Sequence, residues 1–121
     1  MKKDKIIYWI TTALFGTMML FSGSQYFTSP EVTAGFAHFG FPDYFRIELG
    51  IAKLIGALVL LIPQFPTRIK EWAYAGFGIV LISASIAHYS NGDVIAKVIS
   101  PMVFLGILIA SNIYLHKIKG V

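Results

Sequence analysis

The sequence lacks cysteine and has few charged residues. No cysteine occurs among its 121 residues, which excludes disulfides, thiolate metal sites and iron–sulfur ligation. Charged residues make up 13% of the chain, against about 25% in a typical soluble domain, and 56% of the residues are apolar. A chain of this size leaves roughly a third of its unfolded-chain surface exposed to water. With a mean hydropathy of +0.71, the composition indicates a membrane protein and excludes a disordered one.

Long apolar runs fill most of the chain. They predict an all-α integral membrane four-helix bundle in a single domain, residues 1–121, because a spanning helix needs about 20 apolar residues. The runs lack period-two alternation and are too long for strands. The first run could also be a signal peptide, but it is long for that purpose and more runs follow, which favours an uncleaved helix. The predicted spans cover residues 6–27, 44–62, 72–89 and 95–115.

The segment between the first two spans predicts a short helix of its own. Ser29 is a typical N-cap residue, Pro30 is typical of the first helical position, and Gly40 is typical of the position just after a helix. We therefore expect residues 30–39 to form an amphipathic helix on the outer membrane surface or over the mouth of the bundle. Its apolar face would consist of Val32, Phe36 and Phe39.

The basic residues are distributed unequally along the chain. The net charge of +4 comes from residues scattered singly among apolar runs, with no patch of the kind that binds nucleic acid. If both termini are cytoplasmic, seven of the ten basic residues mark the inner side, as the positive-inside rule expects. We therefore predict a multi-pass protein of the cell membrane, with the lipid bilayer as its surroundings and both termini in the cytoplasm. The outer half holds Arg46, Lys53 and Lys97.

The second span carries ionisable residues, which are costly inside a membrane and suggest a functional site. Lys53 lies about 10 Å along the helix axis from Arg46, nearly two turns away, so the two share a face with Gly50. Glu48 falls near the opposite side and is a poor partner for Lys53 in an ideal helix. Simpler roles stay open: Lys53 reaching toward the outer interface, and Glu48 lying at the outer surface.

Further polar residues gather at the outer ends of the other spans. Gln25 closes the first span and His88 ends the third, where interhelical hydrogen bonding or a match to the helix dipole is the simpler role. His38 and His88 could ligate a metal or haem, but no spacing supports this, and no metal site is expected. The inner half is expected to be almost entirely apolar, with Asn112 alone. The candidate site residues are Gln25, Arg46, Glu48, Lys53 and His88.

The third span carries a stripe of small residues at spacings of three and four. Small residues mark contact faces in membrane helices, so the stripe predicts a tight helix–helix contact. The alternative is a channel for an isoprenoid tail or a substrate. The stripe consists of Ala73, Gly76, Val80, Ser83 and Ala87.

Three short motifs resemble the DoxX-like family of small membrane proteins. They are Phe21-Ser22-Gly23 followed by Tyr26, then Phe39-Gly40-Phe41-Pro42, then Glu48-Leu49-Gly50-Ile51-Ala52-Lys53 followed by Gly56. The resemblance implies four transmembrane helices, with Glu48 matching the family glutamate and Gly40 and Pro42 its turn. Lys53 and His88 match positions of the family more loosely.

The resemblance also implies functions. The family takes its name from a membrane subunit associated with thiosulfate:quinone oxidoreductase and terminal oxidase complexes, and some relatives are linked to redox-stress complexes. The first hypothesis is therefore a quinone-interacting accessory subunit of a membrane oxidoreductase. Lys53 or His88 would donate a hydrogen bond to a quinone carbonyl, and Glu48 would carry protons.

Two alternatives remain open at this stage. Distant relatives act as membrane-protein chaperones, and the chain has no catalytic triad, metal motif or phosphate loop, so a non-enzymatic chaperone or assembly factor is the second hypothesis. A small transporter that uses Lys53 and Glu48 is the third and weakest. No catalytic residue is assigned, and whether the protein is an enzyme is left open.

Overall fold

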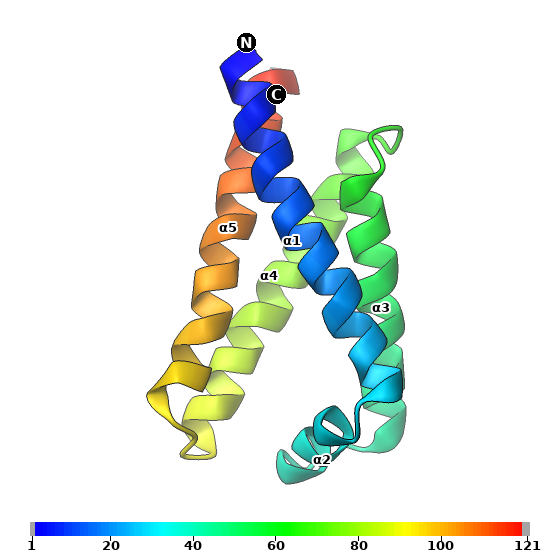
Figure 1. Ribbon diagram of the computed structural model, residues 1–121, viewed down its shortest axis with the longest axis vertical. Helices are drawn as coiled ribbons and strands as arrows, with labels where there is room; N and C mark the ends of the chain where they lie inside the picture. The colour runs from blue at the N-terminus through cyan, green and yellow to red at the C-terminus, as the bar shows by residue number, and fades with distance from the viewer. Residues whose placement is uncertain (1, 120–121) are drawn as a thin grey trace.

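A computed structural model describes residues 2–119, and this part of the chain forms five α-helices and no strand. The all-α prediction is confirmed. Figure 1 shows that α1 begins and α5 ends at one end of the molecule, here called the terminal end, while the opposite end holds α2 and the α4–α5 turn and is called the α2 end. The helices are α1 (Lys2–Thr28), α2 (Pro30–His38), α3 (Asp43–Leu61), α4 (Thr67–Ser90) and α5 (Ile95–Lys119).

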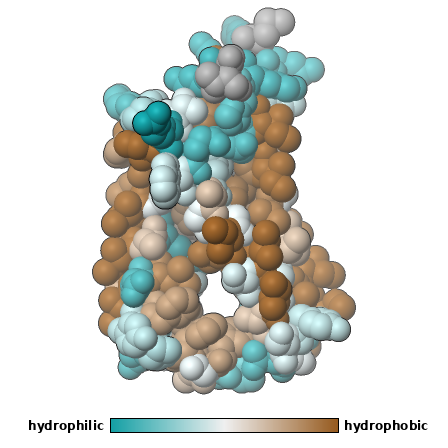
Figure 2. All heavy atoms as spheres, turned by 180° about the vertical axis from the view of Figure 1, so that it is seen from behind, coloured by the Kyte–Doolittle hydropathy of each residue, from teal (hydrophilic) through white to brown (hydrophobic). Residues whose placement is uncertain are grey.

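Three helices, α1, α4 and α5, are long and apolar enough to cross a membrane. Figure 2 shows a mainly apolar belt along the sides of the molecule, with hydrophilic residues gathered at the terminal end. The second predicted span corresponds to α3, which has 19 residues and carries Asp43, Arg46, Glu48 and Lys53. The count of four spans therefore stays a prediction.

The helices pack as two pairs, α1 with α3 and α4 with α5. Extensive contacts between α1 and α5 join the two pairs, whereas contacts between α3 and α4 are sparse. Phe15 is completely buried at the centre and meets Phe77 edge to face, with ring centroids 5.1 Å apart. Truncating such a side chain costs about 3–5 kcal/mol. Below this core, the α1–α3 pair and the α4–α5 pair diverge toward the α2 end (Figure 1).

Glycines allow α1 and α3 to approach closely. A Cβ atom on Gly50 would lie 2.9 Å from the Cβ of Tyr26, and one on Gly23 would lie 3.3 Å from the carbonyl oxygen of Gly50. A Cβ on Gly16 would lie 2.6 Å from the side chain of Leu61. Close backbone approach is the use that membrane helices make of small residues, and it binds α1 and α3 into one unit.

The ends of α2 lie where the sequence predicts them. The Ser29 side chain accepts a hydrogen bond from the Val32 N–H (3.4 Å) at the start. At the other end Gly40 has a φ of +81°, which favours glycine. There the N–H groups of Gly40 and Phe41 return to the carbonyls of Ala37 and Phe36, both at 3.0 Å. This reversal turns the chain from α2 into α3.

Candidate functional site

A cavity of about 730 Å³ lies at the α2 end, where the helix pairs diverge. Figure 2 shows an opening that passes through the molecule in this region. All five helices contribute to its lining, which is mostly apolar. The volume is within the range of about 300–1,000 Å³ that is usual for sites of small molecules. The polar residues of the lining are Ser22, Gln25, Tyr26, Lys53, Ser83, His88 and Ser100.

Three of the five candidate site residues line this cavity, and two do not. Gln25, Lys53 and His88 line it, although they come from α1, α3 and α4. Arg46 and Glu48 do not line it. Glu48 is exposed on the other side of α3 from the buried Lys53, so the expectation that these two residues are poor partners is confirmed.

Lys53 is a buried cation in the cavity wall. The residue is only 8% exposed, and its Nζ donates a hydrogen bond to the Ser22 hydroxyl at 3.2 Å. The same Nζ lies 4.5 Å from the centroid of the Tyr26 ring, a favourable cation–π distance. Within residues 2–119 no carboxylate lies within ion-pair distance of Lys53. Its charge is therefore held by dipoles and an aromatic face.

Arg46 closes the end of α1. Its guanidinium donates to the carbonyl of Tyr26, one of the last carbonyls of α1, and its Nη2 lies 3.9 Å from the Asp43 carboxylate. The final carbonyls of a helix lack partners within the helix and carry partial negative charge, so a cation there is favourable. Arg46 thus holds α1 against α3 beside the cavity.

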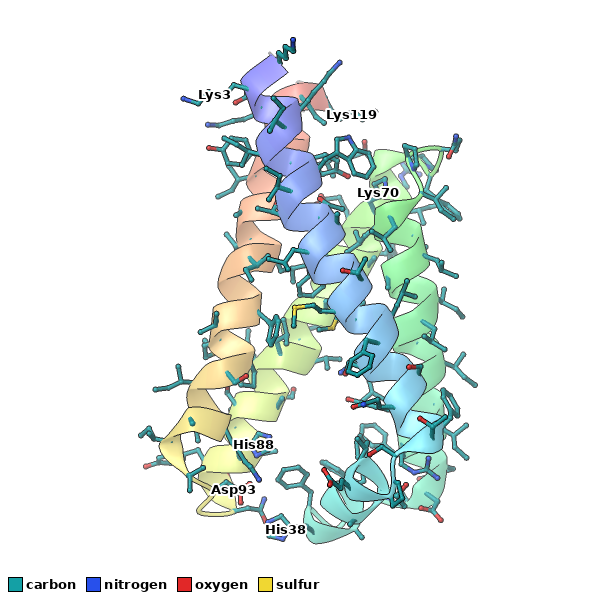
Figure 3. The ribbon with its side chains drawn as sticks, viewed as in Figure 1. Lys3, His38, Lys70, His88, Asp93 and Lys119 are labelled. Atoms are coloured by element: carbon teal, nitrogen blue, oxygen red, sulfur yellow. The ribbon has the colours of Figure 1, made fainter. Side chains whose placement is uncertain are left out.

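Asp93 lies between two histidines at the end of the cavity (Figure 3). Its carboxylate oxygens lie 2.8 Å from His88 Nδ1 and 3.4 Å from His38 Nε2. The hydrogen bond from His88 is the main cause that lowers the pKa of Asp93 from its usual 3.8. We call these three residues the His–Asp clasp; it joins α2 to the α4–α5 turn. Among residues 2–119 no group of three histidine or acidic side chains is arranged to hold a metal ion.

The sequence contains a signal for one of the two contacts of the clasp, the contact between His88 and Asp93. Gly92 has a φ of +71°, and the Asp93 N–H returns to the His88 carbonyl at 3.0 Å. His88 lies four residues before the helix-ending Gly92, and Asp93 follows that glycine directly. The backbone reversal at the helix end therefore brings His88 and Asp93 together. The approach of His38 from α2 had no such local signal.

The terminal half is not almost entirely apolar, and that prediction is wrong. The Ser111 hydroxyl is buried and lies 2.6 Å from the Thr12 hydroxyl and 2.7 Å from the Tyr74 hydroxyl, which joins α1, α4 and α5. Asn112 is not alone either, because its Nδ2 donates to Glu71 at 2.7 Å. The spacing along one helix could not show this, since each partner comes from a different helix.

Lys70 caps α3 at the terminal end (Figure 3). The residue is 2% exposed, although the sequence suggested only a charge at the membrane surface. Its Nζ donates to three carbonyls at the end of α3, of which those of Val59 and Leu60 have no partner within the helix, while that of the C-cap residue Ile62 also accepts from the Phe65 N–H. The acceptors are Val59 at 2.8 Å, Leu60 at 3.0 Å and Ile62 at 3.0 Å.

The small residues of α4 do not form the predicted tight contact along their whole length. A Cβ atom on Gly76 would meet no atom within 4 Å. Because α3 and α4 touch sparsely, a groove of about 450 Å³ lies between them, lined in part by Ala73, Gly76 and Val80. Val80, Ser83 and Ala87 line the cavity. The stripe is therefore open at its centre.

Together these features define an all-helical protein with three helices able to cross a membrane and a cavity between its helix pairs. The model of the DoxX-like family matches residues 10–111, and the chain belongs to this family of membrane proteins. The resemblance of the chain to this family is thereby confirmed. No curated protein and no solved structure matches the chain.

Proposed function

We propose that α1, α3, α4 and α5 all cross the membrane and that both termini are cytoplasmic. The α3 helix runs back alongside α1 from the α2 end toward the terminal end, and its last residue, Leu61, lies beside Gly16 in the middle of α1 (Figure 1). Its cations are turned inward, Arg46 to the end of α1 and Lys53 to the cavity. Because the chain has no cysteine, single cysteines placed at Thr33, before α3, and at Gln64, after it, can be labelled selectively, and we expect Thr33 to react from the outside and Gln64 from the cytoplasm. Labelling of both from one side would contradict the arrangement.

We propose further that α2 is the amphipathic cover of the cavity. Its predicted apolar face supports this, because Val32, Phe36 and Phe39 line the cavity. Exposed residues such as Glu31 and Thr33 lie elsewhere on the helix. A helix with this division of faces rests at the boundary between membrane and water.

We propose that the cavity binds a quinone and that the protein acts as an accessory subunit of a membrane oxidoreductase. The observation that carries the proposal is the convergence of Gln25, Lys53 and His88 on one cavity with apolar walls. A quinone has a flat apolar ring and two carbonyl acceptors, and sites for such molecules combine apolar walls with a few polar groups. The residues present therefore fit the head group.

Each of the three side chains can serve a defined atom of the ligand. Lys53 has three N–H donors, and the Ser22 hydroxyl takes one of them. Gln25 offers an amide with both donors and an acceptor. His88 gives its Nδ1–H to the Asp93 carboxylate, which leaves Nε2 to face a ligand. In neutral His88 that nitrogen accepts a hydroxyl proton of a quinol, and in protonated His88 it donates to a carbonyl.

The proposal places the electron source in a partner protein. The sequence has no cysteine for an iron–sulfur cluster and no dinucleotide-binding motif. Glu48 is exposed on the outside of α3, beside the exposed Ile47 and Ile51. We assign it to contact with the partner subunit rather than with the ligand, because it does not line the cavity.

Co-purification of quinone tests the proposal. The protein is isolated from native membranes in mild detergent, and quinone is extracted and measured per mole of protein. Lys53→Met removes a charged donor and is expected to lower the retained quinone about tenfold. Lys97→Met, at an exposed lysine of α5, is the matched control and should change nothing. Absence of quinone from the unaltered protein, or equal loss in both variants, would overturn the proposal.

A further inference from the structure

The groove between α3 and α4 adjoins the cavity. The two spaces share three lining residues, Leu49, Lys53 and Val80. Among residues 2–119, Lys53 is the only charged residue that lines the groove, and it lies at the end shared with the cavity. The rest of the groove is almost wholly apolar. A molecule with its polar head in the cavity therefore has an apolar path that leads away from Lys53.

The groove has the length of a hydrocarbon chain rather than of a ring. Its lining extends along α4 from Val80 back to Ile69, which corresponds to about 16 Å of helix axis. Its floor is kept open at Gly76, where a Cβ would meet no atom within 4 Å. Gly56 on the α3 side is backed by the Phe77 ring, 2.9 Å from where its Cβ would lie. The open space thus lies beside Gly76, whereas Gly56 allows the Phe77 ring of α4 to lie close to α3.

We propose that this groove receives the isoprenoid tail of the quinone whose head lies in the cavity, and this inference rests on the proposed function. The buried Lys53 ammonium, which has no carboxylate partner within residues 2–119, keeps the head with its carbonyl acceptors at the α2 end. The apolar walls then take the tail toward the terminal end. If the tail lies in the groove, the affinity for a quinone depends on the length of its tail. A site made of the cavity alone would not show this dependence.

Two quinones that share a head group but differ in their tail distinguish binding in the groove from binding in the cavity. Menadione is a naphthoquinone without a tail, and phylloquinone carries a phytyl tail on the same head. Each is titrated into the full-length protein in detergent micelles, and binding is followed by quenching of tryptophan fluorescence, with protein-free micelles correcting for partitioning. The unaltered protein is expected to bind phylloquinone more tightly than menadione.

Gly76→Leu places a side chain in the groove, where a Cβ on Gly76 meets no atom within 4 Å. It is expected to weaken phylloquinone binding about tenfold, the effect of displacing about two methylene groups, and menadione binding less than about twofold. Gly76→Ala should have an intermediate effect. Gly78→Leu is the matched control, because Gly78 is in the same helix, has equally open space and lines neither groove nor cavity.

The outcomes distinguish the two proposals. If menadione does not bind the unaltered protein, the proposed function fails. If menadione binds and Gly76→Leu leaves phylloquinone binding unchanged, the groove inference fails while the head-group site stands. If Gly76→Leu removes co-purified phospholipid but not phylloquinone, the groove is a lipid site and the inference is also overturned.

Discussion

His88 and Asp93 are joined twice, once through the backbone and once through their side chains. The Asp93 N–H donates to the His88 carbonyl at 3.0 Å, and the His88 Nδ1–H donates to the Asp93 carboxylate at 2.8 Å. The backbone bond belongs to the end of α4, where Gly92 reverses the chain. The turn thus presents the carboxylate to His88, and the other oxygen remains for His38 of α2.

Asp93→Asn is expected to loosen α2. The substitution removes the charge that attracts His38 and His88, while the backbone turn at Gly92 is kept. Since partly exposed ion pairs contribute little, hydrogen exchange of the α2 amides should rise about twofold to fivefold. Glu48→Gln removes an exposed acid at the same end of the molecule and should leave this exchange unchanged. Equal exchange in the Asp93→Asn variant and the unaltered protein would show that the clasp does not hold α2.

The contribution of Asp93 to stability should disappear in acid. The pKa of Asp93 is lowered below 3.8 in the folded protein, so its contribution is complete above 3.8 and is lost as pH falls through the lowered value. The difference in thermal unfolding midpoint between the unaltered protein and Asp93→Asn should therefore be present in mild acid, above pH 3.8, and vanish in strong acid. A difference that persists in strong acid, where Asp93 is protonated, would contradict this assignment.

Lys70→Met is expected to destabilise the end of α3. The methionine retains much of the side-chain volume but leaves the carbonyls of Val59 and Leu60 without a donor, which should cost about 3 kcal/mol in the free energy of unfolding. Unfolding in mixed micelles of denaturing and mild detergent measures this. Arg68→Met, two residues earlier and exposed, is the control. If both variants lose the same stability, the cap is not the cause.

Gly50→Ala is expected to separate α1 from α3. The added methyl would lie 2.9 Å from the Cβ of Tyr26, so the helices must move apart at a cost of about 1–3 kcal/mol. Gly106→Ala in α5 meets open space and should be neutral or slightly stabilising, because alanine favours helix. The same detergent unfolding measures both, and a loss of stability at Gly106 comparable to that at Gly50 would contradict the close approach.

Local patterns predicted each helix and both ends of α2, although α4 begins at Thr67, five residues before the predicted span. The start of α2 at Ser29 and its end at Gly40 follow from hydrogen bonds and backbone angles within a few residues. The helical period alone turns Glu48 away from Lys53 and places Lys53 toward the bundle. Such features need no information from other helices, and so the sequence contains them.

Contacts between helices could not be predicted in this way. Lys70 reaches the end of α3 across a turn, and Ser111 meets Thr12 from the other end of the chain. No spacing encodes either contact, because each depends on how two helices cross. The misjudged stripe at Gly76 has the same origin, since a small residue suits a close contact and an open groove equally well.

The sequence by itself determined the surroundings and the elements of this protein. Its few charges and long apolar runs require a nonpolar medium, and its caps and helical period set the helices. Only the tertiary structure decided that Gln25, Lys53 and His88 share a cavity, and that α3 and α4 part to leave a groove beside it. The physical reason is that helix formation is governed by neighbours along the chain, whereas the space between helices is governed by which side chains meet across it.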